Sequence, residues 1–168
     1  MYRIAKTYGH DLGLSCCYRQ HNSTSHCRFL HGYALGVRLE FISFDLEEGW
    51  VLDFGGLKQV KQSIIDLLDH RTLVAIDDPK FDEFQDWHNK GLIQMKVMPV
   101  VSCEGIAEHI YCSTTKWLTE THWYPRVRLT AVTVSEHGSN QATYFDVVDA
   151  TLREQLGAVF VSRQRADA

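Results

Sequence analysis

The chain has 168 residues, of which 45% are hydrophobic and 23% are charged, and its formal net charge is −4 at pH 7. This composition predicts one globular domain that buries a core without disulfides or a structural metal. The absence of clustered basic residues and of long apolar runs excludes nucleic acid and a membrane as expected partners.

The predicted elements begin with two strands. Residues 3–18 form a strand that breaks or bulges near Gly9 and Gly13. After the polar loop 20–25, a second strand covers residues 30–44. Its period-two alternation places on one face His31, Tyr33, Leu35, Val37, Leu39 and Phe41.

A helical region follows these strands. A turn at 45–49 and a short extended piece at 50–54 precede a helix that opens at Gly55. Three- and four-residue spacing predicts an apolar stripe of Leu57, Val60, Ile64, Ile65 and Leu68. The segment 75–99 reads as an insertion that holds a short amphipathic helix ended by Gly91.

A second long helix covers residues 103–120, with Ser102 as its N-cap. Its predicted buried stripe is Cys103, Ile106, Ala107, Ile110, Tyr111, Trp117 and Leu118. The β-branched content of 127–134 predicts a strand, which a turn at 135–140 separates from a last strand at 141–147.

This order predicts an α+β fold with a four-stranded antiparallel sheet and two helices packed on one face. We expect a single domain over residues 1–148 and a helical C-terminal tail over 149–168. Such a sheet has two open edges, which proteins often remove by oligomerising, so we expect a homo-oligomeric ring with active sites between subunits.

Cys27 and His31 are the first candidates for chemistry. The thiol lies four residues before the imidazole, where the strand 30–44 begins. Such a pair supports nucleophilic, acid–base or metal chemistry, and the alternative is a buried cysteine beside a hydrogen-bonded histidine. Five cysteines, no CxxC pair and no signal-peptide core predict reduced thiols and a cytoplasmic location.

Other polar residues have both a functional and a structural interpretation. Asp69 can orient His70 as a proton carrier, or His70 can interact with a helix dipole. Glu136 can accept paired N–H donors from a planar guanidine-like ring, or it can be a solvated turn residue. Asp53 and Glu104 are weaker candidates, because Asp53 can cap the first helix and Glu104 lies in the first turn of the second.

Five segments combine into one ordered pattern. They are Cys27-Arg28-Phe29-Leu30-His31-Gly32-Tyr33, the segment 49–58, Leu68-Asp69-His70, the segment 101–104 and Val134-Ser135-Glu136. In this order they resemble the 6-pyruvoyl-tetrahydropterin synthase and 6-carboxytetrahydropterin synthase group of the tunnelling fold. The resemblance runs from about residue 14 to residue 144 and implies that fold.

The resemblance also implies a pterin-processing lyase and roles for single residues. It implies that Cys27 acts as general acid or base at the pterin side chain. Asp69 and His70 are implied to relay the proton. Glu136 is implied to anchor the pterin ring, and Glu104 lies at a second substrate-binding position of the pattern.

The spacing between Cys27 and His31 is that of the 6-carboxytetrahydropterin branch. The resemblance therefore implies 7,8-dihydroneopterin triphosphate as substrate, on the route to 7-deazaguanines. A 6-pyruvoyl-tetrahydropterin synthase activity, a zinc-free conversion of dihydroneopterin and a non-catalytic pterin-binding protein are the alternatives.

The chain departs from the family at the metal. The family binds Zn²⁺ through three histidines, and here Tyr18 and Tyr33 stand at two of these positions, so His31 alone remains as a metal ligand. A neutral phenol is a poor zinc ligand compared with imidazole or thiolate.

Two interpretations of this departure stay open. Cys16, two residues before Tyr18 on the same strand face, can supply a thiolate with His26 or His10 as a further ligand. Alternatively, the site has lost zinc, and tyrosine hydroxyls with His31 bind the substrate side chain; we favour this second interpretation.

Overall fold

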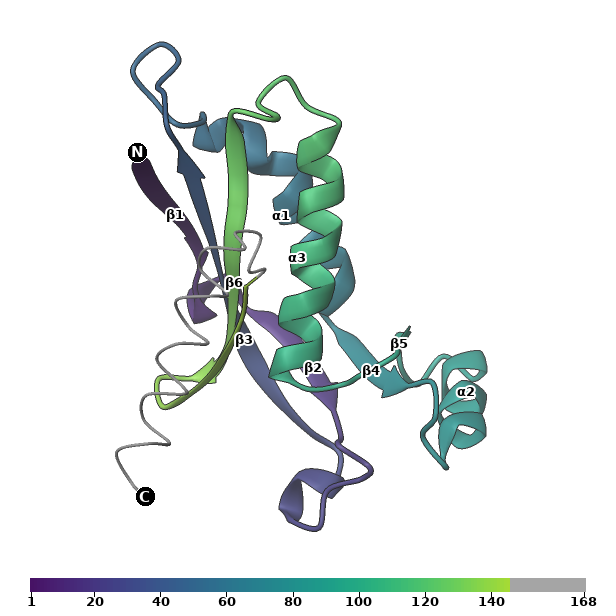
Figure 1. Cartoon of the computed structure of the whole chain (residues 1–168). Helices are drawn as coiled ribbons and strands as arrows, with labels where there is room; N and C mark the ends of the chain where they lie inside the picture. Colours follow the sequence, from purple (N-terminus) through teal and green to yellow (C-terminus); the bar gives the residue numbers. More distant parts are fainter. Residues whose placement is uncertain (146–168) are drawn as a thin grey trace, which may run out of the picture.

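The computed structural model of the chain describes residues 1–145 (Figure 1). Its strands are β1 (Tyr2–Tyr8), β2 (Leu14–Tyr18), β3 (His31–Ser43), β4 (Arg71–Ala75), β5 (Met95–Met98), β6 (Val127–His137) and β7 (Asn140–Phe145). Its α-helices are α1 (Lys58–Leu68), α2 (Phe81–Asn89) and α3 (Cys103–Thr119). Short 3₁₀ turns are η1 (His10–Leu12), η2 (His26–Arg28) and η3 (Phe54–Leu57).

The described strands form one mixed sheet of seven strands, in the order β5-β4-β2-β3-β6-β7, with β1 pairing to β3 beside this path. The α+β class is confirmed, whereas the prediction of a four-stranded antiparallel sheet with two helices was wrong. The added strands β4 and β5 run parallel to β2 and to each other. Both are short apolar runs, which periodicity alone cannot distinguish from pieces of helix.

The first strand breaks where the two glycines predicted it. Tyr8 pairs with Val37 and Leu14 with Leu35, so residues 9–13 loop out opposite a single residue of β3. Gly13 has a φ of +72°, a conformation that side chains with a Cβ rarely adopt. The loop splits one predicted strand into β1 and β2 and opens a hollow beside it.

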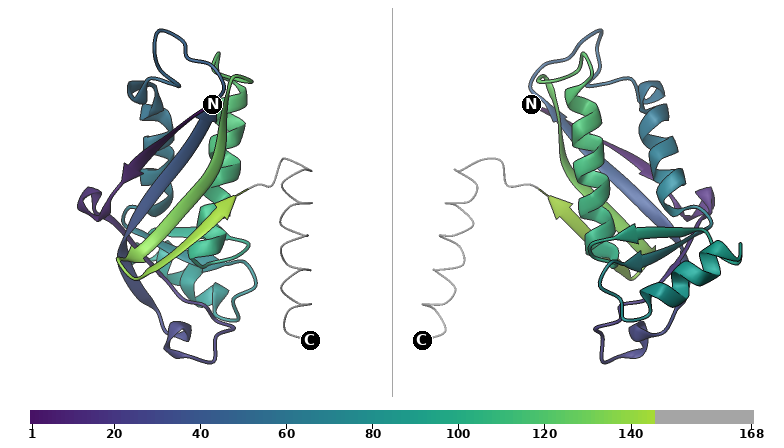
Figure 2. Two further views of the ribbon diagram at one scale, coloured as in Figure 1. Left: turned by 60° about the vertical axis from the view of Figure 1, so that its left-hand side comes forward. Right: turned by 90° about the vertical axis from the view of Figure 1, so that its right-hand side faces the viewer.

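The long strand β3 carries the core, and its predicted alternation is confirmed. Its inward-facing residues Leu35, Val37, Leu39 and Phe41 are at most 1% exposed. Helix α3 lies along β6 and β7, and α1 lies beside β2 and β4 (Figures 1 and 2). Helix α2 packs on β4 and β5, at the opposite end of the sheet from β7.

Two predicted caps lie at the starts of α3 and η3. Ser102 caps α3 by accepting a hydrogen bond from the Gly105 N–H at 3.2 Å. Asp53 accepts one from the Gly55 N–H at 2.8 Å and caps η3. Residues 50–54 were expected to be a short extended piece; Asp53 is extended, and η3 begins at Phe54.

The predicted tail over 149–168 and the domain boundary at 148 lie outside the described residues. None of the helices within residues 1–145 is both long and apolar enough to cross a membrane.

Candidate functional site

Three aromatic rings meet where β2 ends and β3 begins. Tyr18, the last residue of β2, pairs across the sheet with His31, the first residue of β3. Tyr33 lies on the same face of β3 as His31 because it is two residues further along. The ring centroids of Tyr18 and His31 are 5.5 Å apart, and those of His31 and Tyr33 are also 5.5 Å apart. The sheet therefore assembles the three positions that the resemblance assigned to metal ligands.

Tyr18 is fully buried and hydrogen-bonded. Its hydroxyl donates to Glu136 Oε1 at 2.6 Å and lies 3.8 Å from the sulfur of Cys103. Burial first, and then the hydrogen bond to Glu136, raise the pKa of the Tyr18 phenol well above its usual range. The phenol is therefore neutral and already committed as a donor.

Glu136 lies near the end of β6, in a bulge between Ser135 and His137. Bulges re-aim side chains, and this one directs the carboxylate to Tyr18 instead of leaving it in a solvated turn. Its second oxygen accepts a hydrogen bond from Asn140 Nδ2 at 3.4 Å. A carboxylate has about four acceptor lone pairs, so Glu136 can accept further N–H donors.

His31 and Tyr33 carry the remaining polar groups of the cluster. His31 donates its Nδ1–H to the Phe29 carbonyl at 2.7 Å, which leaves Nε2 as an acceptor in the neutral ring. Burial, followed by the negative charge of Glu136, raises the pKa of the Tyr33 hydroxyl. The Tyr33 ring also contacts the ring of His137 at 6.0 Å. The cluster is polar but carries little charge besides Glu136.

The N-terminus of α3 closes the cluster from the helical side. Burial raises the pKa of the Cys103 thiol to about 11, so this thiol is protonated near neutral pH. The next residue, Glu104, is exposed and lines a separate hollow of about 400 Å³ together with Ser102 and His21. Glu104 therefore lies beside the cluster without being part of it.

Cys27 lies in η2 and is half-buried. Its backbone N–H donates to Ser25 Oγ at 3.3 Å. Its carbonyl accepts from the Gln20 N–H at 2.9 Å, and this bond joins the two ends of the loop 20–27. Within residues 1–145, no hydrogen bond, ion pair or ring contact joins the Cys27 side chain to the ring cluster. Cys27 lies four residues before His31, the first residue of β3, and its chemical role stays a prediction.

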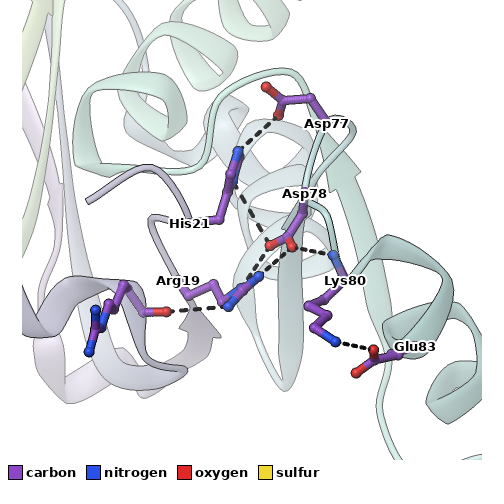
Figure 3. Close-up of polar contacts among 7 residues, drawn as sticks. Arg19, His21, Asp77, Asp78, Lys80 and Glu83 are labelled. Carbon is purple, nitrogen blue, oxygen red and sulfur yellow. Dashed lines mark hydrogen bonds and ion pairs between the residues drawn. The ribbon is translucent and has the colours of Figure 1, made fainter. Parts of the chain in front are cut away.

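A buried ion pair fixes the base of this loop (Figure 3). Arg19 donates two hydrogen bonds to Asp78, at 2.8 and 2.5 Å, and one of 3.5 Å to the Arg28 carbonyl. The Asp78 side chain is 1% exposed and also accepts from the Lys80 N–H at 2.8 Å. The Arg19 guanidinium holds the pKa of the Asp78 carboxyl below its usual range. The pair ties the end of β2 to the turn before α2.

Asp69 and His70 form a pair between the end of α1 and the start of β4. Their side chains meet at 2.7 Å, and His70 has a φ of +54°. The His70 side chain is 82% exposed and lines a hollow of about 480 Å³ that Tyr33 of the ring cluster also lines. Within residues 1–145, no hydrogen bond, ion pair or ring contact joins this pair to Cys27 or Glu136.

The sequence therefore anticipated part of the cluster. His31 and Glu136 converge on Tyr18, whereas within residues 1–145 no hydrogen bond, ion pair or ring contact joins Cys27, Asp69 or His70 to them. The bond between Tyr18 and Glu136 was missed, because its partners are 118 residues apart and no local pattern links them.

The donor set of the ring cluster does not fit zinc. The three ring positions supply one imidazole and two neutral phenols, whereas zinc prefers imidazole, thiolate and carboxylate ligands. In the described chain, no three His, Cys, Asp or Glu side chains are grouped so as to hold a metal ion. Cys16 does not supply the missing thiolate ligand. It is 2% exposed, and burial raises the pKa of its thiol to about 12.

Comparison with known proteins gives a consistent result. Residues 10–146 match the sequence profile of the family described as 6-pyruvoyl tetrahydropterin synthase. The 6-carboxy-5,6,7,8-tetrahydropterin synthase of Aquifex aeolicus is 29% identical over 122 residues, which cover 70% of this chain and 75% of that protein.

Solved structures show the same fold. An uncharacterized protein from Wolinella succinogenes has a TM-score of 0.73 at 22% identity, covering 86% of this chain and 98% of that one. The 6-pyruvoyl tetrahydropterin synthase of Plasmodium vivax has a TM-score of 0.61 at 19% identity, covering 87% and 99%. At these identities the likeness concerns the fold alone, and it agrees with the predicted α+β tunnelling fold.

Proposed function

Because the chain belongs to the 6-pyruvoyl tetrahydropterin synthase family, we propose that it is a pterin-processing lyase acting on 7,8-dihydroneopterin triphosphate. The preferred product is 6-carboxytetrahydropterin, on a route to 7-deazaguanines. Two observations support this branch: the name of the Aquifex aeolicus relative and the three-residue gap between Cys27 and His31.

The observation that carries the proposal is the position of Glu136. The bulge in β6 holds its carboxylate against the ring cluster, with acceptor capacity left for a ligand. A pterin presents a 2-amino group and a ring N–H side by side, which match the two oxygens of a carboxylate. In this role Glu136 anchors the ring, and Cys27 serves as acid or base for the pterin side chain.

Proton relay requires a second chain in this proposal. Asp69 and His70 form a preassembled carboxylate–imidazole pair, yet within one chain they have no contact with Cys27. The exposure of His70 leaves it free to reach the ring cluster of another subunit. The proposed assembly is therefore a homo-oligomer with active sites between subunits, and its five free thiols agree with a cytoplasmic location.

The second candidate function follows from the poor fit of the donor set to zinc. With two phenols at the ring positions, the site would use Tyr33 and His31 to bind the substrate side chain by hydrogen bonds. The proton chemistry at that side chain would then depend on Cys27, and the reaction would be a zinc-free conversion of dihydroneopterin. Retention of Cys27, Asp69 and His70 favours an enzyme over a non-catalytic pterin-binding protein, which needs only the anchor.

Product identification tests both candidates. Purified protein is incubated with 7,8-dihydroneopterin triphosphate, with and without a chelator, and the pterins are identified by mass spectrometry. The leading proposal expects 6-carboxytetrahydropterin, and the zinc-free reading expects turnover that survives the chelator. Binding without any product would indicate a pterin-binding protein. The absence of both binding and product would refute a pterin function.

A further inference from the structure

A third hollow lies beside the loop that interrupts the first strand. Residues 9–13 leave the sheet between β1 and β2, and their displacement opens a hollow of about 310 Å³ against η3 and the start of α1. Extra residues looped out of a strand are often associated with binding sites, because they reshape the surface beside the sheet. This hollow shares no lining residue with the ring cluster of Tyr18, His31, Tyr33 and Glu136.

Three lysines line the hollow, and one of them is held between two aromatic rings. The Lys6 ammonium lies 5.7 Å from the ring centre of Tyr8 and 5.6 Å from that of Phe54. Lys6 is half-buried, so its charge is partly removed from water and fixed in position. A fixed, partly desolvated cation attracts an anion more strongly than a freely moving surface lysine does.

The other two lysines, Lys58 and Lys61, are exposed on the first turn of α1. Like charges three residues apart on a helix repel each other. Within the described residues, none of the three lysines forms an ion pair. The lining includes three lysines and one acidic residue, Asp11, a formal charge of +2 (three minus one), in a chain whose net charge is −4.

We propose that this hollow, the lysine pocket (Lys6, Lys58 and Lys61), binds the phosphate groups of a small phosphorylated ligand. Lysine binds phosphate as a flexible point charge, and three of them around one hollow complement a polyanion. The volume of about 310 Å³ suits a small molecule. The phosphate groups can come from a free polyphosphate or from the triphosphate of a pterin substrate, and the experiment separates these sources.

The direct test is calorimetric titration of the full chain with inorganic tripolyphosphate. The double variant Lys58→Gln, Lys61→Gln should bind roughly tenfold more weakly, because two of the three cations are lost. Lys116→Gln removes an exposed lysine of α3 outside the pocket and should bind as the parent does. Affinity should also fall as salt rises. Both lysines of the double variant are exposed, so its unfolding temperature should stay at or slightly above that of the parent, as repulsion is relieved.

A second arm, which rests on the proposed function, identifies the source of the phosphates. If the pocket holds the substrate's triphosphate, the double variant raises KM for 7,8-dihydroneopterin triphosphate and leaves kcat nearly unchanged. If the ligand is separate, KM is unchanged while tripolyphosphate affinity falls; either result supports the pocket.

Equal tripolyphosphate affinity of the parent and the double variant would overturn the proposal, as would no binding by the parent at millimolar concentration. Tripolyphosphate binding by a protein without pterin turnover would leave the pocket intact and refute only the enzymatic function.

Discussion

Tyr18 and Arg19 are neighbours in the chain, yet they lie in environments of opposite character. Tyr18 donates one hydrogen bond to Glu136 inside a cluster of rings, and that carboxylate keeps free acceptor capacity. Arg19 meets Asp78 through two hydrogen bonds, and Asp78 also accepts from a backbone N–H. The ion pair finds its hydrogen-bond partners within the protein, whereas Glu136 in the ring cluster can still accept hydrogen bonds from a ligand. The difference distinguishes a contact that holds the fold from a site that can receive a ligand.

The largest effect on stability should come from disrupting the ion pair between Arg19 and Asp78. Asp78→Asn leaves the Arg19 guanidinium, which is 22% exposed, without its counter-charge. Removing one partner of a buried ion pair typically costs about 3–5 kcal/mol, and we expect the lower part of that range because Arg19 keeps some contact with water. Urea unfolding measures the loss. Asp77→Asn is the matched control, because the Asp77 side chain is 65% exposed and should change stability by no more than about 0.5 kcal/mol. Equal stability of the two variants would show that the pair is not structural.

The same pair predicts a pH dependence. The pKa of Asp78 is lower in the folded chain than its unfolded value of about 3.9, so the folded state favours the ionised form. The stabilisation from the ion pair is therefore fully present above about pH 3.9 and is lost as the pH falls through the pKa of Asp78 in the folded chain. The stability gap between the parent and Asp78→Asn should narrow below about pH 4. A gap that stays constant on acidification would contradict this cause.

A smaller effect should come from changing Glu136 in the ring cluster, and it should appear in the affinity for a pterin. Glu136→Gln replaces one acceptor oxygen with an NH₂ donor that faces the N–H donors of the ligand. Pterin binding should weaken by roughly 1–3 kcal/mol, the cost of an unpaired buried polar group. Fluorescence titration with a pterin measures it, and Glu108→Gln, an exposed change on α3, is the control. Unchanged affinity would mean that Glu136 serves only Tyr18.

The smallest effect should come from removing the hydrogen bond between Tyr18 and Glu136, and it should appear in stability. Tyr18→Phe removes the phenol donor and keeps the ring, so stability should fall by about 1 kcal/mol, the net value of one hydrogen bond. Tyr124→Phe, at a half-exposed ring, should leave stability unchanged. Thermal unfolding of the two variants compares them. A loss as large as that of Asp78→Asn would remove the distinction between the two environments.

The sequence predicted those features that depend on local patterns. Alternation in β3 located His31 and Tyr33 on the inner face, Ser102 marked the start of α3, and the two glycines marked the break in the first strand. The parallel strands β4 and β5 were missed because short apolar runs have no diagnostic period.

The contacts that define the two environments span long distances in the chain. Arg19 and Asp78 are 59 residues apart, and a charge pattern alone cannot show which aspartate meets which arginine. The bulge that aims Glu136 arises from the pairing of β6 with β7, so a reading of β6 alone suggests a turn. These contacts become visible only when the sheet is assembled.

Turnover of 7,8-dihydroneopterin triphosphate by Cys27→Ala, with pterin binding measured on the same sample, tests the central claim most directly. Cys27 is half-buried in a short turn, so the change should leave the fold and the Glu136 anchor intact. Loss of a general acid or base lowers turnover by at least about 10²-fold, which is the predicted result alongside unchanged binding. Cys112→Ala, at an exposed thiol on α3, should turn over at the parent rate. Parent-rate turnover by Cys27→Ala would contradict the account.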